Sequence, residues 1–333
     1  METASDARLE ASRAWFRQAQ FGMMIHWGLY CLPGGEWNGR RMSGIGEWTQ
    51  QYFRIPNAQY HRLADAFNPI CFDARAWAGL ARDAGMRYLV ITAKHHEGFA
   101  MFHSRVSRFN VADATPFRRD VIAELAEACA DSGIRLGLYY SQDLDWAEPD
   151  GGGYTAGRTW CGGLAGWTND WDFPDNEHKD YTRCFEAKIL PQVEELLTQY
   201  GDLALIWFDT PCTISHDQSR ELVRLVRKHQ PGCLVNSRVG NGMGDYRSMG
   251  DNEIPDHAMP ADGLFESACT LNDTWGYKPF DTNWKPAERI LQLRRHLNER
   301  GLNYLLNVGP DGLGRIPAPA CDILRQAGRD HQD

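Results

Sequence analysis

Two acidic residues lie within or directly after apolar runs, where a charged side chain is unusual. The first is Asp209, near the end of LALIWFDT, and the second is Glu266, inside GLFESACT. A charged side chain is costly to bury unless it is paired or used. Two carboxylates at the ends of barrel strands suit hydrolysis of a glycosidic bond, in which one attacks the anomeric carbon and the other protonates the leaving oxygen.

Each acid also has a structural interpretation. Asp209 could cap the turn at Pro211, and Glu266 could pair with an arginine. Residue types and spacing alone leave these alternatives open.

Three histidines follow expected strands. His95 and His96 are adjacent, so on an extended strand their side chains point to opposite faces and cannot chelate one ion without a bulge. His26 has no second histidine two residues away. We therefore favour hydrogen bonds to a polyhydroxylated ligand over a hydrolytic zinc site. A metal-dependent amidohydrolase remains the alternative.

The run that carries Asp209 predicts a strand buried on both faces, as in parallel sheets. Side chains alternate along a strand. We therefore expect Leu205, Trp207 and Asp209 to face a pocket, with Ile206 and Phe208 on the other face.

Strands and helices alternate along the chain, which predicts an α/β fold of the (β/α)8-like TIM barrel type, formed as a single catalytic domain over residues 1–333. An eighth strand is expected between residues 267 and 303. We also expect Pro191 to kink the helix from Tyr181 to Tyr200. The seven expected strands end at His26, His95, Tyr140, Asp209, Arg238, Glu266 and Val308.

The chain has 333 residues and a formal net charge of -9. With no Lys/Arg-rich run, neither nucleic acid nor an anionic membrane surface is a natural partner. The N-terminus lacks the pattern of a signal peptide and no long apolar run occurs, so we expect a soluble, cytoplasmic protein. Nine scattered cysteines without a CxxC pair indicate reduced thiols. The long loop 147–178 is expected to be ordered over the pocket.

Eight segments, in order from about Trp15 to Pro317, resemble blocks of glycoside hydrolase family 29, the retaining α-L-fucosidases. The resemblance implies an exo-acting enzyme that removes terminal α-L-fucosyl residues from a fucosylated oligosaccharide or glycoconjugate by double displacement, without metal or organic cofactor. The segments are FGMMIHWGLY, GEW, AKHHEGFAMF, LGLYYSQDLDW, IWFD, NSRVGNGMGDY, FESACTLNDTWGY and LLNVGPDGLGRIP.

By this resemblance Asp209 is the nucleophile and Glu266 the acid/base, with Glu47 as a rival for the second role. Tyr139 is the alternative to Tyr140 as the tyrosine of the sugar site, and Trp207 or Trp275 would pack on the sugar ring or its methyl group. The positions that match the fucose subsite are His26, Glu47, Trp48, His95, His96, Tyr140, Trp207 and Arg238.

Two features depart from the family pattern. Gln142 and Asp143 stand where the family usually has two glycines, which predicts added bulk and a possible charge at the subsite rim. The chain ends soon after GRIP, so we do not expect the family's common C-terminal β-sandwich domain. A glycosidase for a related sugar such as an L-galactoside, and a fucose-binding barrel without turnover, remain alternatives, and a homo-oligomer is left open.

Overall fold

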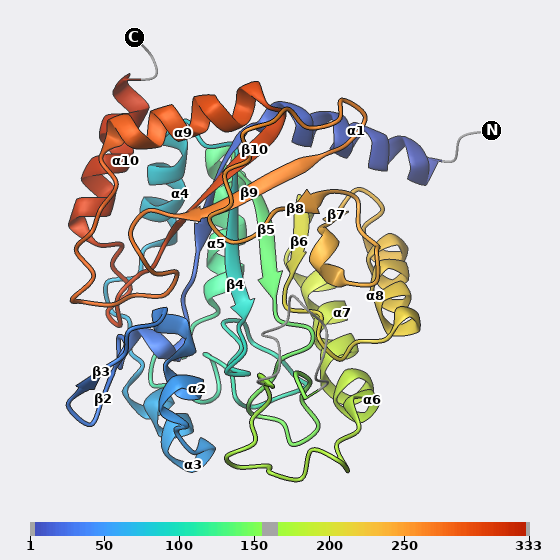
Figure 1. Ribbon diagram of the computed structural model, residues 1–333, viewed down its shortest axis with the longest axis vertical. Coiled ribbons are helices and arrows are strands. Elements are labelled where there is room, and N and C mark those ends of the chain that lie inside the picture. Colours follow the sequence, from blue (N-terminus) through green and yellow to red (C-terminus); the bar gives the residue numbers. More distant parts are fainter. Residues whose placement is uncertain (1–3, 155–165, 331–333) are drawn as a thin grey trace.

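The computed structural model describes residues 4–154 and 166–330. Eight parallel strands form one sheet in the order β7-β6-β5-β4-β1-β10-β9-β8, and a parallel bridge from Asn236 to Tyr246 joins its two edges. The predicted (β/α)8-like barrel is confirmed (Figure 1). The strands are β1 (Phe21–Ile25), β4 (Tyr88–Lys94), β5 (Arg135–Tyr140), β6 (Leu205–Phe208), β7 (Leu234–Val235), β8 (Arg247–Ser248), β9 (Phe265–Thr270) and β10 (Leu302–Val308).

Helices pack around the sheet, while a small hairpin and short helices lie beyond the arrowheads of β4 (Figure 1). Asp73 and Asp120 accept the backbone N–H groups of Ala76 and Ala123 and so cap two helices. The elements are α1 (Ala4–Ala19), β2 (Glu36–Trp37), β3 (Arg40–Arg41), α2 (Thr49–Phe53), α3 (Asn57–Tyr60), α4 (Ala74–Asp83), α5 (Val121–Ser132), α6 (Tyr181–Cys184), α7 (Leu190–Gln199), α8 (His216–His229), α9 (Ala287–Glu299) and α10 (Ala318–Asp330).

Two predictions about the strands are wrong. The eighth strand is β8, which precedes Glu266 and has two residues, too few for a period-2 pattern. Glu266 is not at a strand tip, because it is the second residue of β9, which continues to Thr270. Glu266 therefore lies low in the barrel, level with Asn303 of β10.

The helix expected from Tyr181 to Tyr200 is present in three parts. A π-helical turn, Phe185–Ile189, separates α6 from α7, and Pro191 lies in the first turn of α7. The helical backbone runs on from the π-helical turn into α7. Because proline has no N–H, Pro191 leaves a carbonyl group of that turn without its intrahelical partner, and the irregular geometry falls there.

The alternation predicted for β6 is confirmed. Leu205 and Trp207 pack inside the barrel with Tyr139 of β5. Ile206 and Phe208 pack between the sheet and the helices. The Asp209 side of the strand therefore faces the barrel axis.

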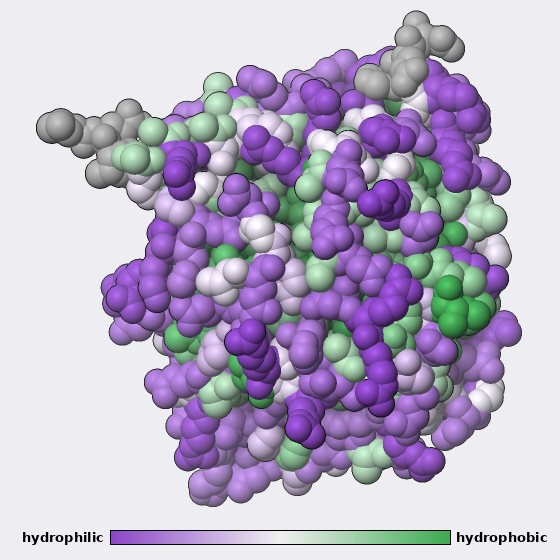
Figure 2. All heavy atoms as spheres, turned by 180° about the vertical axis from the view of Figure 1, so that it is seen from behind, coloured by the Kyte–Doolittle hydropathy of each residue, from purple (hydrophilic) through white to green (hydrophobic). Residues whose placement is uncertain are grey.

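The surface on the side away from the view of Figure 1 is mostly hydrophilic, with scattered apolar side chains (Figure 2). None of the helices in the described part of the chain is long and apolar enough to span a membrane. The eight cysteines within the described ranges are free thiols, and Cys161 lies outside those ranges.

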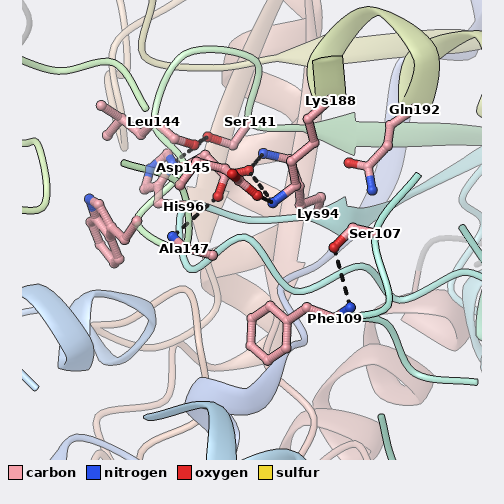
Figure 3. Close-up of polar contacts among 12 residues, drawn as sticks. Lys94, His96, Ser107, Phe109, Ser141, Leu144, Asp145, Ala147, Lys188 and Gln192 are labelled. Carbon is pink, nitrogen blue, oxygen red and sulfur yellow. Dashed lines mark hydrogen bonds and ion pairs between the residues drawn. The ribbon is translucent and has the colours of Figure 1, made fainter. Parts of the chain in front are cut away.

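A buried ion cluster holds the loops at the C-terminal end of the barrel (Figure 3). Asp145 Oδ2 lies 2.7 Å from Lys94 Nζ and 3.0 Å from Lys188 Nζ, and Lys188 also contacts Glu148 at 2.9 Å. The side chains of Lys94 and Asp145 are fully buried. The cluster ties β4, the loop after β5 and the π-helical turn together.

Removing one partner of a buried ion pair leaves an uncompensated charge, so Asp145→Ala is expected to cost about 3–5 kcal/mol of the free energy of unfolding. The matched control is Asp217→Ala on the surface of α8, where Asp217 pairs with His216 and Arg220 in exposed positions. Denaturant unfolding followed by tryptophan fluorescence measures both. Equal losses in the two variants would contradict a special role for the cluster.

Candidate active site

A cavity of about 910 Å³ opens at the C-terminal end of the barrel. Most of the residues that the sequence predicts for the site line it, and Trp167 from the long loop joins them. The predicted residues that line it are His26, Glu47, Trp48, His95, His96, Trp207, Asp209, Arg238 and Trp275.

Asp209 directly follows β6 and is held on three sides. Its Oδ1 accepts a hydrogen bond from Arg238 Nη1 at 2.8 Å, and its Oδ2 accepts one from Tyr139 Oη at 2.8 Å. Its backbone N–H donates to Gln142 Oε1 at 2.8 Å. The carboxylate is thus fixed in orientation while it remains on the cavity wall.

Arg238 links Asp209 to a second acid that sequence reasoning missed. Its Nη2 donates to Asp251 Oδ1 at 2.6 Å, and its guanidinium lies over the Trp207 ring, 4.7 Å from the centroid. Asp251 lines the cavity, and its side chain is 52% exposed. No sequence signal marks Asp251, because β8, which ends three residues before it, is too short to show a strand pattern.

Glu266 is not among the residues that line this cavity. Its side chain is fully buried below Trp207, whose Nε1 donates to Oε1 at 2.8 Å, while Tyr88 Oη donates to Oε2 at 2.6 Å. Burial raises the pKa of Glu266 to about 7. This geometry does not support the expected contact of Glu266 with a leaving group.

Glu47, the rival of Glu266 for the acid/base role, lines the cavity and is also buried. It lies in the 3-10 helix Gly46–Trp48, and its Oε2 accepts the backbone N–H of Gly276 at 2.8 Å. Burial raises the pKa of Glu47 to about 8. The carboxyl group is therefore largely protonated at neutral pH and can donate a hydrogen bond.

The three predicted histidines meet in the cavity wall. His26 Nδ1 lies 2.7 Å from Asn307 Oδ1, and burial lowers the pKa of His26 to about 4. Burial also lowers the pKa values of His95 and His96 well below the usual range. Neutral imidazoles offer one donor and one acceptor each, as a hydroxylated ligand requires.

Metal-ligating side chains are not grouped here. Within residues 4–154 and 166–330, no cluster of three or more His, Cys, Asp and Glu side chains is arranged to hold a metal ion.

Of the two adjacent tyrosines, Tyr139 and not Tyr140 faces the barrel interior beside Asp209. Tyr140 points out of the barrel, where its hydroxyl donates to Gln192 of α7 at 2.8 Å. Tyr139 points inward, stacks between His95 and Trp207, and bonds Asp209. The prediction of Tyr140 is wrong because the phase of β5 relative to the barrel axis is not encoded in its alternation alone.

Comparison with known proteins gives consistent matches. A family model described as alpha-L-fucosidase matches residues 1–330. Rat (Rattus norvegicus) tissue alpha-L-fucosidase is 32% identical over 326 residues, covering 91% of this chain and 64% of the rat protein, so the chain spans slightly less than two thirds of that relative.

Two solved structures are similar over nearly the whole chain. Unliganded alpha-L-fucosidase AlfC from Lactobacillus casei has a TM-score of 0.91 and 52% identity, covering 97% of this chain and 98% of AlfC. Alpha-L-fucosidase from Vibrio sp. strain EJY3 has a TM-score of 0.89 and 39% identity, covering 97% of this chain and 55% of that chain.

The raised pKa of Glu266 predicts that the stability of the folded protein decreases with rising pH. As pH rises from about 4.5 to about 7, the unfolded chain loses this proton while the folded protein keeps it, so the glutamate lowers stability progressively. Glu266→Gln removes this ionisation, so its melting temperature relative to the wild type should rise between pH 5 and pH 8. Glu299→Gln on the exposed end of α9 is the control. A relative melting temperature of Glu266→Gln that stays constant across this range would refute the prediction.

Proposed function

Because the chain belongs to the α-L-fucosidase family, we propose that it is a glycoside hydrolase that removes terminal α-L-fucosyl residues with retention of anomeric configuration. The observation that carries the proposal is one cavity holding two carboxylates, Asp209 and Asp251, on the same guanidinium. Solved structures of AlfC in complex with α-L-fucose product and with Fuca(1,6)GlcNAc support a fucosylated glycan as substrate. Residues 1–333 would act as one catalytic barrel domain.

Asp209 is the proposed nucleophile. Its carboxylate forms a bond to the anomeric carbon as the bond to the glycosidic oxygen breaks, giving a fucosyl-enzyme ester. Arg238 and Tyr139 hold the two oxygens, so little reorganisation is needed before attack. Water then attacks the same carbon and releases Asp209.

Asp251 is the proposed acid/base, in place of Glu266. The acid must protonate the leaving oxygen and later accept a proton from water, so it must reach both the aglycone side and solvent. Asp251 is half-exposed in the cavity, whereas both oxygens of Glu266 are occupied beneath Trp207. The single guanidinium between Asp209 and Asp251 is compatible with the separation of about 5 to 5.5 Å that retention requires.

The cavity wall supplies the recognition of the sugar. His95 lines the cavity, and its neutral imidazole ring has one donor and one acceptor with which to recognise sugar hydroxyls. Glu47, His26 and His96 add further polar atoms. Trp275 gives an apolar surface beside His26, suited to a ring face or a methyl group.

Replacing the nucleophile should remove nearly all turnover. Asp209→Ala is expected to lower kcat on an aryl α-L-fucoside by about 10⁴-fold or more, because binding alone cannot replace covalent catalysis. Wild-type kcat in this variant would refute the mechanism. Turnover of an aryl α-L-galactoside, measured in the same assay, tests whether the enzyme prefers fucose over the related sugar that differs at C6.

Azide decides the acid/base. In Asp251→Ala the small anion can attack the fucosyl-enzyme without base assistance, so azide should accelerate turnover of an activated aryl fucoside and yield fucosyl azide. Glu47→Ala and Glu266→Ala are the matched controls and should show no acceleration. Acceleration in either control and not in Asp251→Ala would move the role to that glutamate.

Adjacent tyrosines offer a further test. Tyr139→Phe removes the hydrogen bond to Asp209 and is expected to lower kcat by about 10-fold or more. Tyr140→Phe removes an equally buried hydroxyl that bonds Gln192 outside the barrel, and should leave kcat nearly unchanged. Steady-state kinetics on the same aryl fucoside compare the two. Equal losses would show that the Tyr139 bond has no special role.

A further inference from the structure

Gln142 and Asp143 follow β5 and depart from the family pattern, yet their side chains are not at the rim of the cavity. Both residues are fully buried. The prediction of added bulk and charge at the rim is therefore wrong. Buried polar side chains need partners to offset desolvation, and those partners lie around Asp209.

Gln142 connects the backbones of the two central residues of the site. Its Oε1 accepts the N–H of Asp209 at 2.8 Å, and its Nε2 donates to the carbonyl oxygen of Arg238 at 2.9 Å. Both ends of one amide are thus used. The link fixes the start of the Asp209 side chain relative to that of Arg238.

A second amide bonds the backbone of the residue before Asp209. Asn236 Oδ1 accepts the N–H of Phe208 at 2.9 Å, and its Nδ2 donates to the carbonyl oxygen of Phe208 at 2.9 Å. Beyond the last paired residues of β6 and β7, side-chain amides therefore take over the bonding of the backbone. Gln142 is the member of this pair that reaches Asp209.

Asp143 holds the segment that follows Asp209. Its Oδ2 accepts the N–H groups of Thr213 at 2.6 Å and Ile214 at 2.7 Å. Within this segment Thr210 has a φ of +48°, which is strained for a β-branched residue. Such a conformation persists only where neighbouring bonds impose it.

We propose that Gln142 and Asp143 are positioning residues that hold the backbone on both sides of Asp209, so that its carboxylate stays aligned with Arg238 during attack. The inference rests on the proposed nucleophilic role of Asp209. Neither side chain needs to touch the sugar. Their loss should therefore slow the chemical step and leave sugar binding nearly intact.

The test compares two buried glutamines. Gln142→Met keeps the size of the side chain and removes both hydrogen bonds, so kcat on an aryl α-L-fucoside is expected to fall by about 10- to 100-fold, with KM within about threefold. Gln192 of α7 is also fully buried and uses both ends of its amide, accepting from Tyr140 and donating to Ser104. Gln192→Met should keep kcat within about twofold, whatever its effect on the melting temperature.

The kinetic split separates positioning from general destabilisation. If Gln142→Met does not fold, Asp143→Ala replaces it, with the same expected fall in kcat at a nearly constant KM. If kcat is unchanged in Gln142→Met, or in Asp143→Ala where that variant replaces it, the proposal is overturned. An equal fall in the kcat of Gln192→Met would also overturn it. In both cases the wild-type enzyme would still have fucosidase activity. A wild-type enzyme that releases no fucose would overturn the proposed function and this inference together.

Discussion

The position of Arg238 between two carboxylates is the contact on which the rest of the site depends. Asp209 and Asp251 bond different nitrogens of its guanidinium. Two carboxylates this close repel unless a cation lies between them, and the planar fork of arginine serves two acceptors at once. The face of Trp207 covers the same group and adds a cation–π contact. Removal of Arg238 would leave two like charges near each other without a cation between them.

Below Arg238, further side chains in the barrel interior are linked one beneath the other. Trp207 lies under the guanidinium, and its indole N–H bonds Glu266, which also accepts from Tyr88. Two buried donors need an acceptor, and one carboxyl group supplies both bonds. Glu266 thus has a structural explanation other than the arginine pair considered from the sequence. It fixes the ring on which Arg238 rests.

Features that lie in long regular sequence patterns could be predicted, and those in short or irregular elements could not. Alternation in LALIWFDT grouped Trp207 with Asp209 on one face, and the pocket role expected of Asp209 identified that face as the inner one. The height of Glu266 depends on its pairing with Asn303, and nothing in either strand specifies that register. Asp251 was missed because β8 has only two residues. The choice between adjacent tyrosines depends on the register of β5 relative to β4, and this register shifts between Thr92 and Lys94.

The loops at the strand ends were the hardest to predict because their backbone groups lack regular ladder partners. Side chains that are distant in sequence supply the missing bonds, as Gln142 and Asp143 do for the segment around Asp209. This arrangement has a cost, since burial raises the pKa of Asp143 to about 6 despite the backbone bonds that lower it. The carboxylate is explained if a fixed nucleophile matters more than the stability lost, because an aligned group needs no reorganisation at the moment of reaction.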